Sequence, residues 1–371
     1  DLAFLSWTIY NDQVYGGSDN KYTSGSNNYF YSDIYFKQTT NLNLSAYYWQ
    51  PIGIGYTRDG TSASRYFSGN YDGGGHTVSG VFTPAGSSNG YSYQGLFGRV
   101  YSGSSTQQAS IANLGVIDSF IRGYQYVGGV VGYASSSTVS NVYNTGSVSG
   151  TGNYVGGVVG YAGSYATISN EYNTGSVSGS SDVGGVVGYA YSYSTISNEY
   201  NTVSVSGSYF VGGFVGCFNA ATVRNVYNTG SVSGDSRVGG VVGYVTSTGN
   251  NSTLTNVYNI GLVSGTGNYV GGVVGYTTNR SDITNTYYGG DCTLDVGIGS
   301  GSGSAKKIDS LVEEWAKNEE WYSAEATLED GTLIWDSAYP WDFENVWNIS
   351  VVFNGGYPCF DAFWTDKLAQ N

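Results

Sequence analysis

A motif of four residues, Gly-Val-Val-Gly or a near copy, recurs at nearly even intervals through the middle of this 371-residue chain. The spacings between successive copies are 28, 28, 28, 27 and 32 residues, and the copies begin at Gly129, Gly157, Gly185, Gly213, Gly240 and Gly272. A second block follows each copy and reads SNVYNTGSVSG at its first appearance, from Ser140. A repeat of this length cannot bury a hydrophobic face alone, so the copies must stack on one another.

The aligned copies predict three short strands per repeat, separated by glycine-rich corners. In the second block an aliphatic residue such as Val139 is followed two positions later by Asn and two further on by Tyr, whereas the residue between Asn and Tyr varies from Val142 to Glu171. Period-two alternation that tolerates charge at one parity is typical of a strand with one buried face. We therefore expect the aliphatic, Asn and Tyr positions to face inward, and Glu171 and Glu199 to form a surface pair on an outward column.

Stacked copies of such a unit predict an all-β fold, a parallel β-solenoid with coils of about 28 residues. Identical residues then form ladders along the axis, in which Asn side chains hydrogen-bond from coil to coil and aromatic rings stack. A buried Asn is costly unless it is satisfied, so an unbroken column indicates a ladder at an interior corner. The predicted ladders comprise Asn141, Asn170, Asn198, Asn225, Asn256 and Asn285, and Tyr143, Tyr172, Tyr200, Tyr227, Tyr258 and Tyr287.

The tetrad GLFG, from Gly95, and the GGVVG runs, together with the NVYNTGSVSG blocks, resemble the GLUG-motif repeats of bacterial and archaeal cell-surface proteins. That family includes adhesins and non-catalytic regions of large surface peptidases. The stretch FSGNYDGGGHTVSGV from Phe67 is similar to the coils that usually precede such repeats, and Gly356-Tyr357-Pro358 is similar to their usual end. The resemblance implies a fold and a cell-surface setting, but it fixes no activity, because these repeats occur in proteins of varied function.

Four segments follow from the repeat boundaries. Residues 1–30 form an N-terminal segment, 31–123 irregular entrance coils with a diverged first repeat, 124–288 the repeat solenoid, and 289–371 an acidic C-terminal cap. The run IDSLVEEWAKNEEW from Ile308 has apolar residues at helical spacing, so we expect the C-terminal cap to be partly helical. Residues 1–285 carry 9 Lys/Arg and 12 Asp/Glu, whereas 286–371 carry 4 and 15, which gives net charges of −3 and −11.

Composition excludes several partners. Nucleic-acid binding requires a basic patch of clustered Lys and Arg, and the sequence shows no such patch. No apolar run approaches the roughly 20 residues that cross a bilayer. Low charge with abundant Ser, Thr, Asn, Gly and Tyr favours an extracellular or cell-surface location, and the absence of Met indicates a processed, mature chain.

Few residues offer site chemistry. His76 is the single histidine, so we expect a structural role for it and no catalytic or metal site built on histidine. Cys292 and Cys359 stand near the two ends of the acidic segment, and an oxidising compartment would join them in a disulfide. Asp291 with Asp295 is a weak calcium candidate, because the spacing is not that of an EF-hand. No other cofactor is expected.

The first strand of each repeat has apolar residues at both alternating positions, Val131 with its copies and Val130 with its copies. If Val130 and its copies point outward, they form an apolar stripe suited to self-association or to contact with other surface proteins. This stripe comprises Val130, Val158, Val186, Phe214, Val241 and Val273. We therefore predict a non-enzymatic structural or adhesive surface protein that assembles into a filament or layer. The alternative is a carbohydrate-binding module that presents Tyr, Asn and Ser to polysaccharide. A remote alternative is ice binding through a Thr/Ser ladder.

Overall fold

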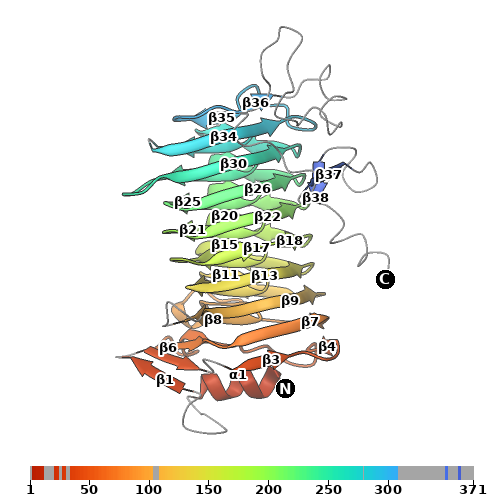
Figure 1. Ribbon diagram of the computed structural model, residues 1–371, viewed down its shortest axis with the longest axis vertical. Helices are drawn as coiled ribbons and strands as arrows, with labels where there is room; N and C mark the ends of the chain where they lie inside the picture. The colour runs from red at the N-terminus through yellow and green to blue at the C-terminus, as the bar shows by residue number, and fades with distance from the viewer. Residues whose placement is uncertain are drawn as a thin grey trace.

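The computed structural model describes residues 2–11, 21–24, 27–30, 34–102, 108–278 and 280–307, and the backbones of strands β37 (Trp347–Ile349) and β38 (Pro358–Phe360). Those residues form an elongated stack of coils (Figure 1), which confirms the predicted parallel β-solenoid of about 28-residue coils. The run from Ile308, predicted to be helical, lies outside the described residues.

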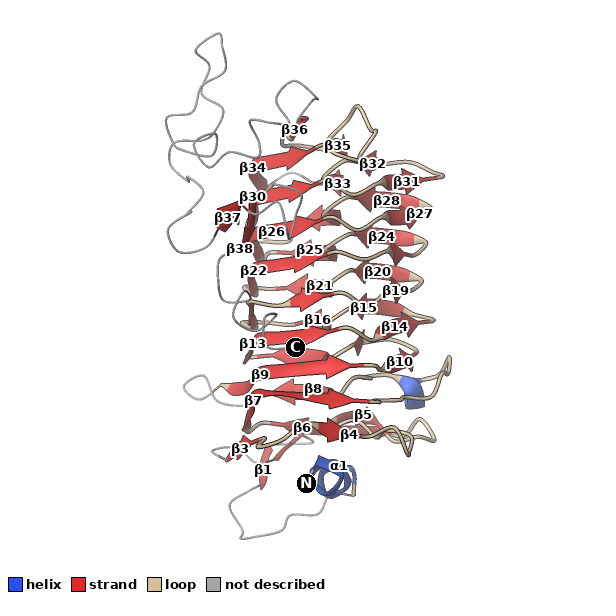
Figure 2. Cartoon of the chain, turned by 90° about the vertical axis from the view of Figure 1, so that its right-hand side faces the viewer, coloured by secondary structure: helices blue, strands red, loops and turns tan. Residues whose placement is uncertain are grey.

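Four sheets run along the stack, two with twelve strands and two with six (Figure 2). The first twelve-stranded sheet contains β1 (Lys21–Ser24), β2 (Asn27–Phe30), β5 (Ile54–Tyr56), β6 (Ser62–Phe67), β8 (Phe97–Tyr101), β12 (Val131–Ser135), β16 (Val159–Ala162), β21 (Val187–Tyr191), β25 (Val215–Asn219), β29 (Val242–Thr246), β33 (Val274–Thr277) and β35 (Ile298–Ser300). The second contains β3 (Tyr35–Lys37), β4 (Leu42–Asn43), β7 (Asn70–Ser79), β9 (Ala109–Ile117), β13 (Ser137–Asn144), β17 (Thr167–Ser169), β18 (Tyr172–Asn173), β22 (Thr195–Asn201), β26 (Thr222–Asn228), β30 (Ser252–Asn259), β34 (Ser281–Tyr288) and β36 (Lys306–Lys307).

The two shorter sheets complete each coil. One contains β10 (Phe120–Gly123), β14 (Ser147–Gly150), β19 (Val177–Ser178), β23 (Val205–Ser206), β27 (Val232–Gly234) and β31 (Val263–Gly265). The other contains β11 (Val127–Gly128), β15 (Asn153–Gly156), β20 (Ser181–Gly184), β24 (Tyr209–Gly212), β28 (Ser236–Gly239) and β32 (Val270–Gly271). Pairing between repeats is parallel and joins equivalent residues, as Val131 with Val159 and Tyr133 with Tyr161.

The N-terminal end has a helix that the sequence did not reveal. Helix α1 (Leu2–Tyr10) lies across the first coils and buries Leu2, Leu5 and Ile9 (Figure 1). The end also has antiparallel pairs, β1 with β2 and β5 with β6, and a short 3-10 helix, η1 (Asn89–Tyr91). A solenoid end exposes unpaired strand edges, and α1 with these irregular strands covers the edge here.

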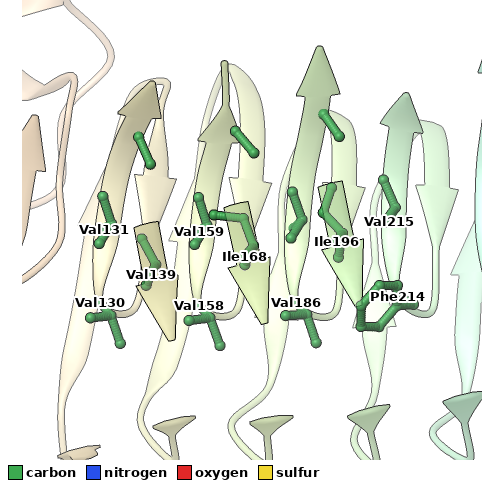
Figure 3. Close-up of a cluster of buried hydrophobic side chains, with 14 of the residues drawn as sticks. Val130, Val131, Val139, Val158, Val159, Ile168, Val186, Ile196, Phe214 and Val215 are labelled. Carbon is green, nitrogen blue, oxygen red and sulfur yellow. The ribbon is translucent and has the colours of Figure 1, made fainter. Parts of the chain in front are cut away.

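The predicted apolar stripe is not on the surface. All six of its residues, from Val130 to Val273, have no exposed area, and Figure 3 shows four of them beside inward residues such as Val131. The chain turns a corner between β11 and β12, and the N–H groups of both Val130 and Val131 donate to the carbonyl oxygen of Val158, at 3.0 Å each. Because the corner interrupts the alternation, two consecutive valines point into the core, and the predicted interface is wrong.

This burial gives a test of the corrected assignment. Val186→Ala should lower the free energy of unfolding by about 2 kcal/mol, because it removes methyl groups from a packed interior. Ser178→Ala, at an exposed position of β19, should change it by less than about 0.5 kcal/mol. Guanidinium denaturation of each variant measures these changes in the free energy of unfolding. An interface residue would behave differently, since Val186→Ala would then alter sedimentation and leave stability unchanged.

Candidate functional site

The Asn column forms a continuous hydrogen-bonded ladder on the second twelve-stranded sheet. Each amide Nδ2 donates to the Oδ1 of the preceding coil at 3.0–3.3 Å, and Asn141 donates to Asn113, so the ladder extends into the diverged first repeat. Every member has a left-handed backbone, with φ of 54° at Asn141 and 59° at Asn170. Asn tolerates this conformation better than other residues with a side chain. The column therefore combines backbone geometry with side-chain bonding.

The left-handed Asn also reverses which parity of the strand faces inward. Ser140 before it is partly exposed, whereas Val142 directly after it has no exposed area, and Asn144 is fully buried. Tyr143 consequently lies on the outer side, partly exposed. The expectation that the Tyr column faces the core is therefore wrong for Tyr143, because one residue with positive φ shifts the alternation. Tyr172 and Tyr200 are likewise partly exposed, whereas Tyr227, Tyr258 and Tyr287 are buried.

The same reversal places two carboxyl groups in the core. Glu171 is 1% exposed and Glu199 is 0% exposed, one coil apart, at the position that Val142, Val226 and Val257 occupy in other coils. Among the described residues, none makes a hydrogen bond of good geometry to a carboxyl oxygen of either side chain, although the Ser197 backbone beside Glu199 acts to lower the pKa of that group. The prediction of an outward surface pair is wrong. Burial, and then the charge of Glu199, raises the pKa of Glu171 well above its ordinary value, and burial raises that of Glu199.

This carboxyl pair is not an active site of the glycosidase kind. Two carboxyl groups that cleave a glycosidic bond must reach a substrate in a groove. Glu171 and Glu199 are instead enclosed by aliphatic side chains of the core, so no substrate contacts them. The two groups affect stability instead: the folded protein is more stable at pH values at which both carboxyl groups are protonated.

A second Asn column, which the sequence reading did not single out, forms the interior corner. Its members are Asn144, Asn173, Asn201, Asn228 and Asn259, each without exposed area. Asn173 Nδ2 donates to the Gly175 carbonyl oxygen at 2.6 Å, and its Oδ1 accepts from the Gly175 N–H at 3.2 Å. A Cβ on Gly157 would lie 2.4 Å from Asn173 Cγ, so the glycine of the tetrad makes room for this ladder. The recurrence of Asn three positions after the outer Asn was the available signal.

The tyrosine columns stack face to face along the axis. From Tyr143 to Tyr258 successive ring centroids lie 4.8–5.2 Å apart, with interplanar angles of 3–5°. A second stack on the first twelve-stranded sheet joins Tyr133, Tyr161 and Tyr189 at 5.2 and 5.3 Å. Because neighbouring rings stack face to face, they cover one another's faces within each column, and Tyr227 and Tyr258 are also buried.

Beside the second tyrosine stack, two positions that are aromatic in neighbouring coils have smaller residues. Cys217 takes the place of a tyrosine in the column of Tyr189, and Asp182 takes the left-handed position that Tyr154 has one coil earlier. Burial raises the pKa of Asp182 to about 6, and burial together with Asp182 raises the pKa of the Cys217 thiol well above its ordinary value. A thiol with a raised pKa is a weak nucleophile. Cys217 is therefore a structural residue.

The remaining candidates do not converge. His76 lies in β7 opposite Leu114. Asp295 pairs with Lys307, Oδ1 to Nζ 3.0 Å, and both it and Asp291 are exposed. Among the described residues no group of three His, Cys, Asp or Glu could hold a metal ion. None of the described helices is long and apolar enough to cross a membrane.

Cys292 is a buried free thiol in the structure, and the side chain of Cys359 lies outside the described residues, so the disulfide stays a prediction. If it forms when the protein is produced in an oxidising compartment, alkylation after denaturation without reductant should modify one of the three cysteines, Cys217, and all three after reduction. Intact mass gives the count. Three modified cysteines without reductant would show that Cys292 and Cys359 are unpaired.

Comparisons with known proteins agree with the sequence pattern at one coil. Residues 123–149 match the model of the GLUG motif, a segment that ends within β14. Among solved structures, the chain is similar to one described as a "putative immunoglobulin A1 protease from Bacteroides ovatus", with 18% identity, a TM-score of 0.49, and coverage of 88% of this chain and 86% of that chain. No curated protein was found to match the chain. The match to the motif confirms the resemblance seen in the sequence: this parallel β-solenoid contains a GLUG motif at residues 123–149.

Proposed function

We propose that this protein is a non-enzymatic rod of the extracellular space or cell surface, with a structural or adhesive role. The observation that carries the proposal is the register of the coils. Equivalent positions lie opposite one another in successive coils, so each outward position recurs at the strand spacing of about 4.8 Å. A rigid body with repeated surface chemistry is suited to display and to multivalent contact.

The chemistry of the described residues supports a role without catalysis. The two glutamates that could have formed a dyad are buried among aliphatic side chains, and the buried thiol of Cys217 has a raised pKa. Catalysis requires a nucleophile or an acid and base positioned where a substrate can reach them. The outward positions are instead mostly Ser, Thr, Asn and Tyr, which form hydrogen bonds and contact surface.

Surface display tests the adhesive role. The chain is fused to an outer-surface anchor of a non-adherent bacterium, and attachment to epithelial cells, to mucin and to sibling cells is compared with a matched β-solenoid of similar length. We expect greater attachment that the soluble chain inhibits in a saturable manner. Attachment equal to that of the control, together with hydrolysis of casein or polysaccharide by the purified chain, would replace this proposal with an enzymatic one.

A further inference from the structure

A groove of about 780 Å³ lies at the N-terminal end of the solenoid. One wall is helix α1 with the residue that follows it, and includes Trp7, Tyr10 and Asn11; the opposite wall runs from Asn43, the last residue of β4, to Gln50. Both elements lie at the same end of the stack (Figure 1). Small-molecule sites have volumes of roughly 300–1,000 Å³, so the groove has the size of a binding site.

Three exposed aromatic side chains line this groove. Trp7 is 47% exposed, Tyr48 70% and Tyr47 83%. The Tyr48 ring rests on Phe82, with 5.2 Å between the centroids, which supports one side of the ring and leaves most of its surface open. This differs from the tyrosine columns of the repeats, where neighbouring rings cover one another's faces.

The groove is held in place by buried contacts beneath it. Trp49 is 6% exposed, and its Nε1 donates to the Leu96 carbonyl oxygen at 2.9 Å. The Ser6 hydroxyl of α1 donates to the carbonyl oxygen of Gln50, which joins the two walls. Walls fixed before binding lower the entropy lost when a ligand is ordered.

The polar side chains that line the groove are amides and hydroxyl groups. Asn11, Asn43 and Gln50 supply the amides, and none of the described lining residues is Asp, Glu, Lys or Arg. Asn43 Oδ1 accepts from the Ser45 N–H at 2.9 Å, which orients the amide so that its NH₂ group can donate to a ligand. Amide groups both donate and accept, as the hydroxyl groups of a sugar require.

We propose that this groove binds an uncharged carbohydrate, whose C–H faces stack on Tyr47 and Tyr48 while its hydroxyl groups bond to the amides of Asn43 and Gln50. The combination of exposed tyrosine rings and neutral hydrogen-bonding groups fits a sugar. An anionic polymer fits less well, because none of the described residues that line the groove is Lys or Arg. The inference rests on the proposed adhesive role and names a ligand class for it.

Affinity electrophoresis of the full chain tests the groove. Native gels contain dextran, mannan or a soluble β-glucan as uncharged polymers, or polygalacturonate as the anionic one. We expect retardation by at least one uncharged polymer and none by polygalacturonate. Tyr47→Ala and Tyr48→Ala should each weaken the interaction about tenfold, as for aromatic residues at the centre of an interface. Both side chains are exposed, and unchanged thermal unfolding establishes that each variant is folded.

A matched control uses exposed tyrosines elsewhere. Tyr165 and Tyr193 are 58% and 51% exposed and stack on each other at 5.3 Å in the repeat region, so Tyr165→Ala and Tyr193→Ala should leave retardation unchanged. Equal loss in these variants would place the binding on the repeat face and overturn the groove. Absence of retardation by every uncharged polymer would overturn it as well. If surface-displayed Tyr47→Ala cells still attach like the wild type, the groove fails as the adhesive site while the adhesive role itself stands.

Discussion

Replacement of both buried glutamates by valine, Glu171→Val with Glu199→Val, should stabilise the protein, and the gain should increase with pH. Valine is the residue that most other coils have at this position, as at Val142 and Val226. Burial raises both glutamate pKa values above their ordinary value of about 4.5, so the folded state binds protons that the unfolded state has released. Their contribution is therefore greatest below about pH 4.5 and is lost as the pH rises from there.

The expected size follows from this linkage. Each glutamate costs about 1.4 kcal/mol for every pH unit by which the pH exceeds its unfolded pKa, up to its folded pKa, so the advantage of the double variant over the wild type should grow from pH 5 to pH 9. Guanidinium denaturation near pH 5 and near pH 9 measures the difference. Glu171→Gln with Glu199→Gln is the matched control: it removes the titration but keeps buried polar groups, so it should flatten the pH profile with a smaller gain near pH 5. A wild-type stability that does not fall with rising pH would contradict this account.

The interior Asn ladder gives the second large effect. Asn173→Ala should lower the free energy of unfolding by about 4 kcal/mol or more, because it removes an amide that makes four hydrogen bonds in a fully buried corner. Both backbone groups of Gly175 and the amides of Asn144 and Asn201 each lose a partner. Every unsatisfied buried group costs roughly 1–3 kcal/mol. Chemical denaturation of the single variant measures the loss.

A matched substitution in the outer ladder separates side-chain bonding from backbone geometry. Asn170→Gly keeps the left-handed conformation, φ 59°, and removes two hydrogen bonds of a partly buried side chain, so we expect a loss of about 1 kcal/mol. Asn170→Ala should cost more, because alanine disfavours this conformation by about 1–2 kcal/mol. If Asn170→Gly destabilises as much as Asn173→Ala, the outer ladder is the principal one and the ranking here is wrong.

The solenoid itself could be predicted from the sequence because the repeat is explicit. The nearly even spacing of the tetrads indicates the coil length, and residues such as Tyr133 and Tyr161 that align in sequence also pair in register. Which side each residue faces could not be predicted by strict alternation. The outer Asn adopts a left-handed conformation after Ser140 and reverses which residues of the strand face the core beyond it. Strict alternation therefore assigned Glu171, Glu199 and residues of the Tyr column, such as Tyr143, to the wrong side.

The two other errors have equally local causes. Val130 looked outward because it alternates with Val131, yet the corner after Gly129 turns both inward. Helix α1 has apolar residues on all sides and lies beyond the repeat, so periodicity gave no signal for it. The groove beside α1 joins residues about 40 positions apart, such as Trp7 and Tyr47, and no spacing rule brings them together.

The register between coils also affects how the gene for such a protein can change. Residues of one coil pair with the equivalent positions of the coils above and below. A duplicated or deleted copy of about 28 residues therefore creates a junction like those already present. Each added copy lengthens the rod by roughly 4.8 Å and leaves the end structures unaltered. Recombination between copies can therefore adjust the reach of the rod in steps of one coil, without a new core having to be optimised.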